Sequence, residues 1–503
     1  MKKNNFILLN FIFVFLRRIK YFLLKNYKYG KLILISKGLA FLFLLFFTSC
    51  ISYYQIQYAF NSNFEQGNLP GADAALNKEK KPDQKKTKLL FYLNKGVVSS
   101  MLGKYEESNL FLEKAYLIAE DYHVNYINEV ESFLLNPNFT EYRGEDEEIL
   151  LINYYKALNY LKLGLNNEAL VECKRLNIRL NQLSDKYTSN NKFKRDAFIN
   201  VLMGLIYEAN GEINDAFISY RNAVDIYEND YKKFFNFGAP EQLKKDLLRT
   251  AYLNGFTDEL NFWQKKFNMS YQPTPTSSGD LIFLWHNGLG PIKDQDGINF
   301  TIQHSPQGFI NFSNANFGFN FSFPLSDSSY HQSGLSRLEF IRVVFPKYIE
   351  RPVYFNNAQI SWSGKNFPLE KVEDVNGIAF KGLQERMLKE VGKSLLRLAL
   401  KKAEEYTLRS KDQNLGALVG IFNAITEQAD TRGWQSMPHT IYYSRLSLPA
   451  GEQKVTFTPQ NAHQNSGDSS NLNVFKFNIK SGKTVFHTFS SLETLHPSTF
   501  IKR

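Results

Sequence analysis

The sequence predicts a multidomain fold, in which an N-terminal α-solenoid of paired helices precedes a β-rich α+β domain with one or two helices. Small residues recur at fixed offsets through residues 96–223, as expected where the two helices of a hairpin cross closely. Beyond a stretch rich in Pro, Ser and Gly, the hydrophobic period changes from 3.6 to 2 residues. We therefore expect a helical repeat domain at 50–270, a linker at 271–280 and an α+β domain at 281–503.

The repeat frame is clearest between Phe198 and Tyr227. Gly204 and Ala216 lie where two short helices would cross, and Gly211 lies in the turn between them. Small side chains permit the crossing, and glycine adopts the left-handed turn without strain. The same offsets recur at Ala157, Gly164 and Ala169, at Gly96, Gly103 and Ser108, and in part at Gly67, Ala72 and Leu76. This signature resembles the tetratricopeptide repeat (TPR), although frames 61 and 47 residues apart make the array irregular.

The positive charge of the chain is concentrated at its N-terminus. The net charge is +11, but residues 1–50 contain nine Lys or Arg and no acidic residue, which leaves +2 for the remainder. The folded part is therefore close to neutral, and we expect no nucleic-acid partner.

Residues 1–49 are expected to be a cleaved leader. An apolar run, Leu39–Phe47, is followed by Thr48, Ser49 and Cys50, an arrangement that resembles the lipobox of bacterial lipoproteins. That resemblance implies lipidation of Cys50, and each buried CH₂ of the acyl chains would contribute about 0.8 kcal/mol to anchoring. The alternative is an uncleaved anchor, but the run is shorter than the roughly 20 apolar residues of a membrane-spanning helix. The long extension before the run leaves open whether translation starts at Met1.

The C-terminal half is expected to contain strands and one clear helix. Strands are predicted at Leu281–Trp285, Leu338–Phe345, Val353–Trp362, Thr440–Leu446, Lys454–Phe457 and Val474–Ile479. Alternation at Phe317, Phe319, Phe321 and Phe323 predicts four rings on one face of a further strand, between the loops HSPQG and SDSSYHQSG. A stripe through Leu383, Met387, Val391, Leu395 and Leu398 predicts the helix, and Leu415–Ala429 predicts a second.

The order of several segments resembles one family of TPR-containing bacterial lipoproteins whose function is uncharacterised. The segments are YYKALNYLKLG, MGLIYEANGEINDAFISYRNAVDIY, NGLGPIK, VVFPKYIERP and ADTRGWQSMPHTIYYSRLSLPAG. The resemblance spans most of the chain after Cys50 and implies an architecture without catalytic residues. The Phe-rich region 302–335 is longer than the family pattern, which marks it as a candidate insert.

The sequence contains few signals for enzymatic chemistry. It has no GxxxxGK[ST], GxGxxG or GxSxG motif, and its eight histidines are scattered. We predict no enzyme activity, cofactor or metal. The best polar cluster surrounds Asp430 and Arg432, which more often pair at a helix end than form a site. Glu373 and Asp374 could supply acid–base carboxylates, but a turn is the simpler interpretation.

These observations predict a membrane-anchored scaffold for protein–protein interaction in the cell envelope. Stacked hairpins form a groove lined by their first helices, here Leu151–Lys162 and Phe198–Ala209. The candidate contacts with an extended peptide are Asn153, Tyr154, Lys162 and Asn200, although a merely solvated face is equally consistent. The partners expected are envelope proteins of unknown identity and, through the lipid, the membrane.

Two other functions stay open. A glycan- or peptidoglycan-binding module predicts that Trp362, Trp434 or a neighbouring Tyr is exposed on a flat face. An enzyme near Asp430 and Arg432 would need a cleft with another titratable group. Ile51, which follows the lipobox cysteine, is not the Asp associated with inner-membrane retention, so we expect the outer membrane and its periplasmic face.

Overall fold

The computed structural model describes residues 55–124, 140–185, 195–273, 277–305, 307–316, 318–332, 339–384, 395, 429–460 and 472–494. The leader and the predicted lipidation residue Cys50 lie outside these ranges. Residues 1–60 and 61–503 form two compact units, and the description below concerns the second. Within the described ranges, no helix is both long and apolar enough to cross a membrane.

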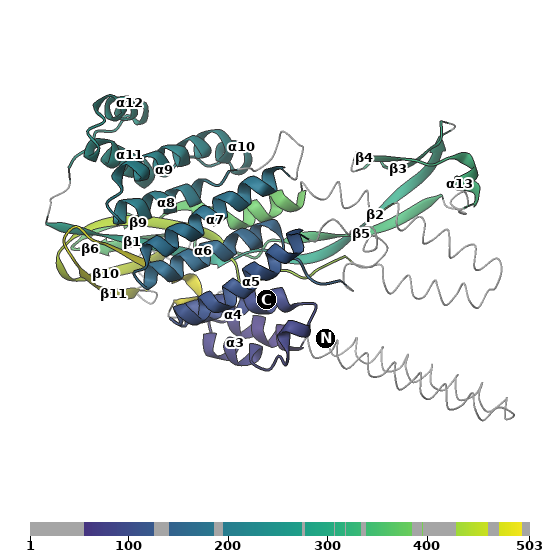
Figure 1. Ribbon diagram of the computed structural model, residues 1–503, viewed down its shortest axis with the longest axis horizontal. Coiled ribbons are helices and arrows are strands. Elements are labelled where there is room, and N and C mark those ends of the chain that lie inside the picture. The colour runs from purple at the N-terminus through teal and green to yellow at the C-terminus, as the bar shows by residue number, and fades with distance from the viewer. Residues whose placement is uncertain are drawn as a thin grey trace. The chain divides into compact units, whose positions relative to one another are not determined.

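The first half of the larger unit is an array of helical hairpins, as predicted (Figure 1). Among the described residues, four hairpins are complete, with both helices within one range: α4/α5, α6/α7, α8/α9 and α11/α12. The helices are α3 (Leu69–Leu76), α4 (Lys88–Met101), α5 (Tyr105–Val124), α6 (Asp146–Lys162), α7 (Asn166–Asp185), α8 (Ala197–Ala209), α9 (Ile213–Ile226), η5 (Tyr227–Tyr231), α10 (Lys232–Phe235), α11 (Glu241–Leu253) and α12 (Thr257–Phe267). The predicted fold class, a TPR-like solenoid followed by a β-rich domain, is confirmed.

Every complete hairpin turns at a glycine in the left-handed conformation. These are Gly103, Gly164, Gly211 and Gly255, with φ between +71° and +82°. In each turn, the amide of the residue after the glycine donates to the carbonyl four residues before the glycine, at 2.8–3.0 Å. This Schellman bond satisfies the last carbonyls of the first helix and fixes where the chain reverses. The Gly255 turn extends the frame to a fourth hairpin, α11/α12, which is not among the repeat frames identified in the sequence.

The small residues of the frame lie where the helices cross. A Cβ atom built on Gly204 would lie 2.4 Å from the Tyr220 ring, and one on Gly96 would lie 2.5 Å from Leu112. Both distances are far below van der Waals contact. The glycines therefore allow α4 to pack on α5 and α8 on α9 with a large side chain filling the gap.

The described residues of the second half form three four-stranded sheets. The central sheet has the order β12-β1-β9-β8, with β1 parallel to β12 and the other pairs antiparallel. The outer sheet has the order β11-β10-β6-β7, and the phenylalanine-rich sheet has the order β4-β3-β2-β5. The strands are β1 (Ser278–Leu289), β2 (Ile292–Ser305), β3 (Phe309–Asn314), β4 (Phe319–Pro324), β5 (Phe340–Ile349), β6 (Asn357–Trp362), β7 (Lys365–Pro368), β8 (Glu370–Glu373), β9 (Pro438–Pro449), β10 (Gly451–Gln460), β11 (Asn473–Ile479) and β12 (Thr484–Ser490).

The central sheet is buried on both faces. Leu281, Phe283 and Trp285 of β1 belong to the core shared with the outer sheet, which includes Val455 and Phe457. The alternate side chains of β1 point the other way, toward the helices. A strand that is covered on both sides reads as a continuous apolar run, which explains the sequence LIFLW within β1.

The phenylalanine-rich sheet has one apolar face, as the alternation predicts. Phe319, Phe321 and Phe323 of β4 pack against a core that includes Phe300 and Leu395. Phe317, the fourth predicted ring, lies outside the described residues. A short helix, α13 (Asp327–Gln332), replaces part of the loop predicted at SDSSYHQSG, because Asp327 lies in its first turn and favours a helix start.

The described part of the predicted C-terminal helices is small. Residues 375–384 are helical, as is Leu395, so the helix begins before the predicted stripe. The rest of that stripe lies outside the described residues, as do residues 415–428 of the second predicted helix.

Candidate functional site

The face of the array that was expected to form an open groove is covered by the chain's own central sheet. In Figure 1 helices α6 and α8 lie alongside β1 and β9. The first helices of the hairpins make the contacts. Tyr154 of α6 hydrogen-bonds His286 of β1 at 2.8 Å, and Tyr443 of β9 donates to Asp246 of α11 at 3.2 Å. The surface predicted to bind an extended peptide is therefore an internal interface.

Two of the four predicted groove residues are buried, which corrects the expectation that they point outward. Asn153 is 0% exposed and donates to Glu172 of α7 at 2.8 Å. Tyr154 is 2% exposed and packs its ring on Phe198 as well as on His286. The physical reason is that a Tyr or Asn at a helix surface is as able to satisfy a second protein layer as a ligand.

The other two predicted residues lie at the margins of the interface. Asn200 is half-buried and donates to the backbone carbonyl of Asp196 at 2.9 Å. Lys162 places its Nζ 3.3 Å from Nδ1 of His487 on β12. Neither residue contributes to an open groove, and whether either contacts a partner stays a prediction.

A small polar cavity lies beside Lys162. Its volume is about 70 Å³, enough for a few water molecules, and its lining includes Tyr105, His286 and Glu493. Burial lowers the pKa of Lys162 to about 8, partly offset by Glu493. Burial and the nearby Lys162 lower the pKa of His286 to about 3, so this imidazole is neutral at physiological pH. Burial in the cavity therefore disfavours the positive charge of the Lys162 amino group.

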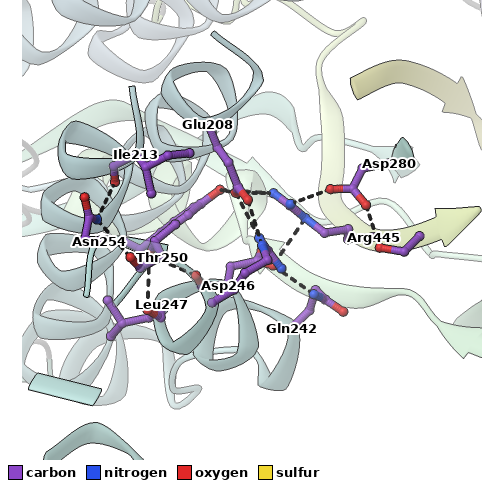
Figure 2. A network of polar contacts seen from close by, with 12 residues as sticks. Glu208, Ile213, Gln242, Asp246, Leu247, Thr250, Asn254, Asp280 and Arg445 are labelled. Atoms are coloured by element: carbon purple, nitrogen blue, oxygen red, sulfur yellow. Dashed lines mark hydrogen bonds and ion pairs between the residues drawn. The ribbon is translucent and has the colours of Figure 1, made fainter. Parts of the chain in front are cut away.

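A buried network of ion pairs is centred on Arg445 of β9 (Figure 2). Its guanidinium contacts Glu208 at the end of α8 (2.8 Å), Asp246 of α11 (3.3 Å) and Asp280 of β1 (2.9 Å). Arg249 binds the same Glu208 at 2.7 Å and Asp246 at 2.8 Å. Two arginines and three carboxylates thus join two hairpins to two strands of the central sheet.

The network sets the ionisation of its members. Burial opposes the negative charge of Glu208, but Arg249 and Arg445 outweigh it and hold the pKa of Glu208 well below its usual range. Glu208 is therefore charged at neutral pH. Such a fixed arrangement of paired charges, with no vacant position among them, joins two surfaces rather than binding a substrate.

A second buried cluster contains a pair of carboxyl groups, Asp196 and Glu373. Asp196 precedes α8, where its side chain accepts from the amide of Ile199 at 2.8 Å. Glu373 ends β8 and accepts from the hydroxyl of Tyr231 at 2.9 Å. The two carboxyl groups lie close enough for each to influence the pKa of the other. Burial raises the pKa of both, and repulsion from Asp196 adds to the rise at Glu373, so the pair retains a proton.

Glu373 was interpreted from the sequence as part of a turn with no evident partner. In the structure its partner is Asp196, which belongs to the helical array and lies 177 residues earlier in the chain. The neighbouring Asp374 accepts from the amide of Gly377 at 2.8 Å and begins the next helix. The sequence contains no local signal for the carboxyl pair.

The cluster at Asp430 and Arg432 is a local ion pair, the interpretation that the sequence favoured. Arg432 binds Asp430 at 2.6 Å and also donates to the backbone carbonyl of Thr140 at 3.1 Å. Trp434 is 1% exposed and packs against Tyr155, and its amide donates to Glu148 at 2.6 Å. Trp434 therefore belongs to the core and offers no flat aromatic face to a glycan.

Two further chemical groups are accounted for within the described residues. The thiol of Cys173 is buried, which raises its pKa, and a thiol of this kind is a poor nucleophile. In the same ranges, no three or more His, Cys, Asp or Glu side chains are placed to hold a metal ion.

An exposed apolar feature repeats on the second helix of each hairpin. The seventh residue after each turn glycine is a large hydrophobic residue: Leu110 on α5, Val171 on α7, Ile218 on α9 and Phe262 on α12. Their exposed fractions are 68%, 49%, 37% and 56%. We name these four residues the outer ridge. The frame itself could have revealed them, because equivalent positions of stacked repeats line up on one side of a solenoid.

Comparisons with known proteins give a distant likeness to helical-repeat structures. No family model matches this sequence, and no curated protein matches it. Matching solved structures include BtubC (BKLC) from P. vanneervenii, at 14% identity and a TM-score of 0.29, over 44% of this chain and 83% of that one. MamA protein matches at 15% identity and a TM-score of 0.28, over 44% and 98% of the two chains. A tetratricopeptide repeat protein from Parabacteroides merdae ATCC 43184 matches at 15% identity and a TM-score of 0.20, over 44% and 81%. At these scores the likeness carries no information about function.

Proposed function

We propose that this protein is a membrane-anchored bacterial lipoprotein that acts as a TPR-type scaffold for protein–protein interaction in the cell envelope. The observation that supports it most is the outer ridge, which places a large exposed apolar side chain at the same position of four successive hairpins. Isolated exposed hydrophobic residues are common on protein surfaces, but a periodic set on one side of a repeat array is typical of a binding surface.

The ridge, rather than the groove, is the surface that can receive a partner. The central sheet already covers the first helices, and the Arg445 network holds that arrangement in place. The second helices therefore keep a fixed spacing. Burying one Leu, Val, Ile or Phe side chain contributes about 1.5–3 kcal/mol, so four in register would supply a substantial part of a specific interaction.

The partner that fits is an envelope protein with a complementary apolar face, such as an amphipathic helix lying across the hairpins. Charged side chains flank the ridge on the same helices, including Glu113 and Lys114 on α5 and Arg221 on α9. Such a polar rim around apolar contacts gives specificity. The anchor at Cys50, the outer membrane and its periplasmic face belong to this proposal through the sequence pattern of the leader.

The ridge is tested by in-cell crosslinking of the full-length protein, followed by mass spectrometry of the captured proteins. The test variant replaces Leu110, Val171, Ile218 and Phe262 together with serine. We expect at least one envelope protein to be captured by the native chain and to be lost, by tenfold or more, from the variant. The matched control replaces two exposed hydrophobic residues of the sheets, Ile349 and Val474, with serine. A partner that the ridge variant retains, or that the control loses equally, contradicts the proposal.

The anchor is tested separately, by replacing Cys50 with serine. We expect the native protein to incorporate labelled palmitate and to sediment with outer membranes, whereas Cys50→Ser should do neither, because the thioether-linked lipid cannot form. A variant that still sediments with membranes and is still labelled would exclude Cys50 as the lipidation site. The outcome does not affect the ridge test, since that test reads partner capture.

A further inference from the structure

The phenylalanine-rich sheet has a second face, which is open. On its packed side, Phe300, Phe312 and Val343 are completely buried. The side chains that alternate with these point the other way and are exposed or half-buried. They are Asn299, Thr301 and Gln303 of β2, Phe309, Asn311 and Ser313 of β3, Asn320 and Ser322 of β4, and Phe340 and Arg342 of β5. We name these ten residues the open face.

Strand register arranges the open face in rows. One row crosses all four strands as Asn320, Ser313, Thr301 and Phe340, which are direct partners in the pairings of β4 with β3, β3 with β2, and β2 with β5. A second row contains Ser322, Asn311 and Gln303. Because neighbouring strands lie about 4.8 Å apart, the four-residue row is roughly 15 Å long.

The composition of the open face differs from that of an ordinary solvated sheet. Of its ten residues only Arg342 is charged, whereas charged residues make up 22% of the chain. Solvated strands near a sheet edge usually carry Lys or Glu, which prevents association with other strands. Three of the ten are Asn, a residue that is disfavoured within strands. The sheet therefore keeps amide groups at a cost in strand propensity.

Several polar groups of the open face are held in place by their neighbours. The hydroxyl of Ser322 donates to Oδ1 of Asn311 at 2.6 Å. This bond fixes the orientation of the Asn311 amide, whose NH₂ group can act as a donor. The hydroxyl groups of Thr301 and Ser313 form a hydrogen bond of 2.8 Å. A pre-oriented donor loses less entropy on binding than a mobile one.

The aromatic and cationic members border these rows. Phe340 is 69% exposed at the end of the four-residue row, so its ring is available for stacking. Arg342 lies across Gly297 of β2: a Cβ atom on that glycine would lie 2.5 Å from the Nε atom of Arg342. Only a glycine leaves room for the guanidinium to lie flat on this surface.

We infer that the open face binds a neutral glycan chain. Amides and hydroxyls in rows can exchange hydrogen bonds with sugar hydroxyl or acetamido groups, and the exposed Phe340 ring can stack on the C–H face of a pyranose. Nucleic acid or an anionic lipid surface would require a cluster of Lys and Arg, and this face has a single Arg342. A protein partner would bury a central apolar cluster, which the rows of Asn, Ser and Thr do not provide.

The test is isothermal titration calorimetry of the full-length protein in detergent, with chitohexaose and cellohexaose as probes. We expect saturable binding of at least one of these neutral hexasaccharides. Phe340→Ser should weaken it roughly 3- to 10-fold, the loss that accompanies removal of one aromatic contact. Asn311→Asp, which keeps the shape and the bond from Ser322 but removes the NH₂ donors, should weaken it by a similar factor. Val474→Ser, at a position on the outer sheet that is 50% exposed, should leave the sugar affinity unchanged.

Three outcomes would overturn the inference. The first is the absence of saturable binding to both hexasaccharides. The second is an equal loss in Val474→Ser, which would indicate non-specific adhesion. The third is an unchanged sugar affinity in Phe340→Ser together with a change of sedimentation coefficient, which would identify the face as a contact between two copies of the chain. None of these outcomes bears on partner capture by the outer ridge, so this inference and the proposed scaffold function fail independently.

Discussion

Replacing Arg445 with methionine is expected to lower the free energy of unfolding by about 3–5 kcal/mol, the cost of removing one partner from a buried ion network. Arg445 neutralises Glu208, Asp246 and Asp280 at distances of 2.8–3.3 Å. Methionine fills a similar volume, so a cavity contributes little. The loss comes from the three carboxylates, because Glu208 and Asp246 keep only Arg249 as a cationic partner and Asp280 loses its arginine. Urea denaturation of the full-length chain, monitored by circular dichroism, measures this change in the free energy of unfolding.

The matched control for Arg445→Met is Arg195→Met. Arg195 also binds two carboxylates, Asp225 at 2.7 Å and Asp230 at 3.0 Å, but its side chain is 43% exposed. An exposed pair of this kind contributes about 1 kcal/mol or less, because water and salt screen it. If the two substitutions cost the same, burial of the Arg445 network is not what stabilises the joint between array and sheet.

The pH dependence of the Arg445 effect has a definite sign. The pKa of Glu208 is held below its ordinary value of about 4.3, so its contribution to stability is present above that pH and is lost as pH falls through the folded-state pKa. The difference between the native chain and Arg445→Met should therefore be constant from pH 6 to 8 and shrink below about pH 4. A difference that grows on acidification would contradict the assignment of Glu208 as a charged partner.

The repeat array could be predicted because its signals are local. Gly204, Gly211 and Ala216 lie within 13 residues of sequence, and each is small for a reason that acts inside one hairpin. The fourth hairpin was missed as a repeat because Leu260 occupies the position where the other frames have Ala or Ser. Its turn glycine, Gly255, was the one remaining signal, and a single glycine is weak evidence.

Among the strands, β2 shows why local pattern reading fails. Its first residues are IKDQDG, which read as a loop, yet they pair with β5 as regularly as the apolar part that follows. Asp296 binds Lys347 across the two strands at 3.0 Å, and Lys293 forms a buried ion pair with Glu145 of the array. The charges of β2 are thus satisfied by residues that the sequence places far away.

The groove contacts were wrong for Asn153, which donates to Glu172 within its own hairpin, and for Tyr154, which the central sheet covers. The frame identifies which side of a helix faces the inside of the solenoid, but it contains no information about what covers that side. The cover includes His286, 132 residues after Tyr154, and Arg445, 237 residues after Glu208. Partners at such separations leave no periodicity to read, so the interface between array and sheet could not be derived from the sequence.

Replacing Glu373 with glutamine is expected to leave stability near pH 5 almost unchanged and to increase it at pH 8–9. Burial, then repulsion from Asp196, raises the pKa of Glu373 well above its ordinary value of about 4.3. A group with a raised folded-state pKa contributes stability that is fully present below the unfolded-state pKa and is lost as pH rises toward the folded-state pKa. Each pH unit between the two pKa values removes about 1.4 kcal/mol.

Glutamine reproduces the protonated form of Glu373. Its carbonyl oxygen can accept from Tyr231 and from the amide of Asp374, as the carboxyl group does, and its NH₂ group can donate to Asp196. Glu373→Gln therefore keeps these hydrogen bonds at every pH, whereas the native pair must give up its proton in alkali. Thermal unfolding of both proteins from pH 5 to 9 measures the divergence.

Two further variants decide whether the shared proton is the cause. Asp196→Asn should flatten the same alkaline loss, because Asn also caps the start of α8 through its side-chain oxygen. Glu452→Gln, whose side chain is 71% exposed, should follow the native curve throughout. If Glu373→Gln and the native chain lose stability in parallel between pH 5 and 9, the pair does not titrate in that range, and the assignment of the alkaline loss to Glu373 is contradicted. The expected result is that the stability curves of both pair variants separate from the native curve in alkali only, while the curve of Glu452→Gln does not. That result would mean that the proton on the Asp196–Glu373 pair stabilises the contact between α8 and β8 below neutral pH.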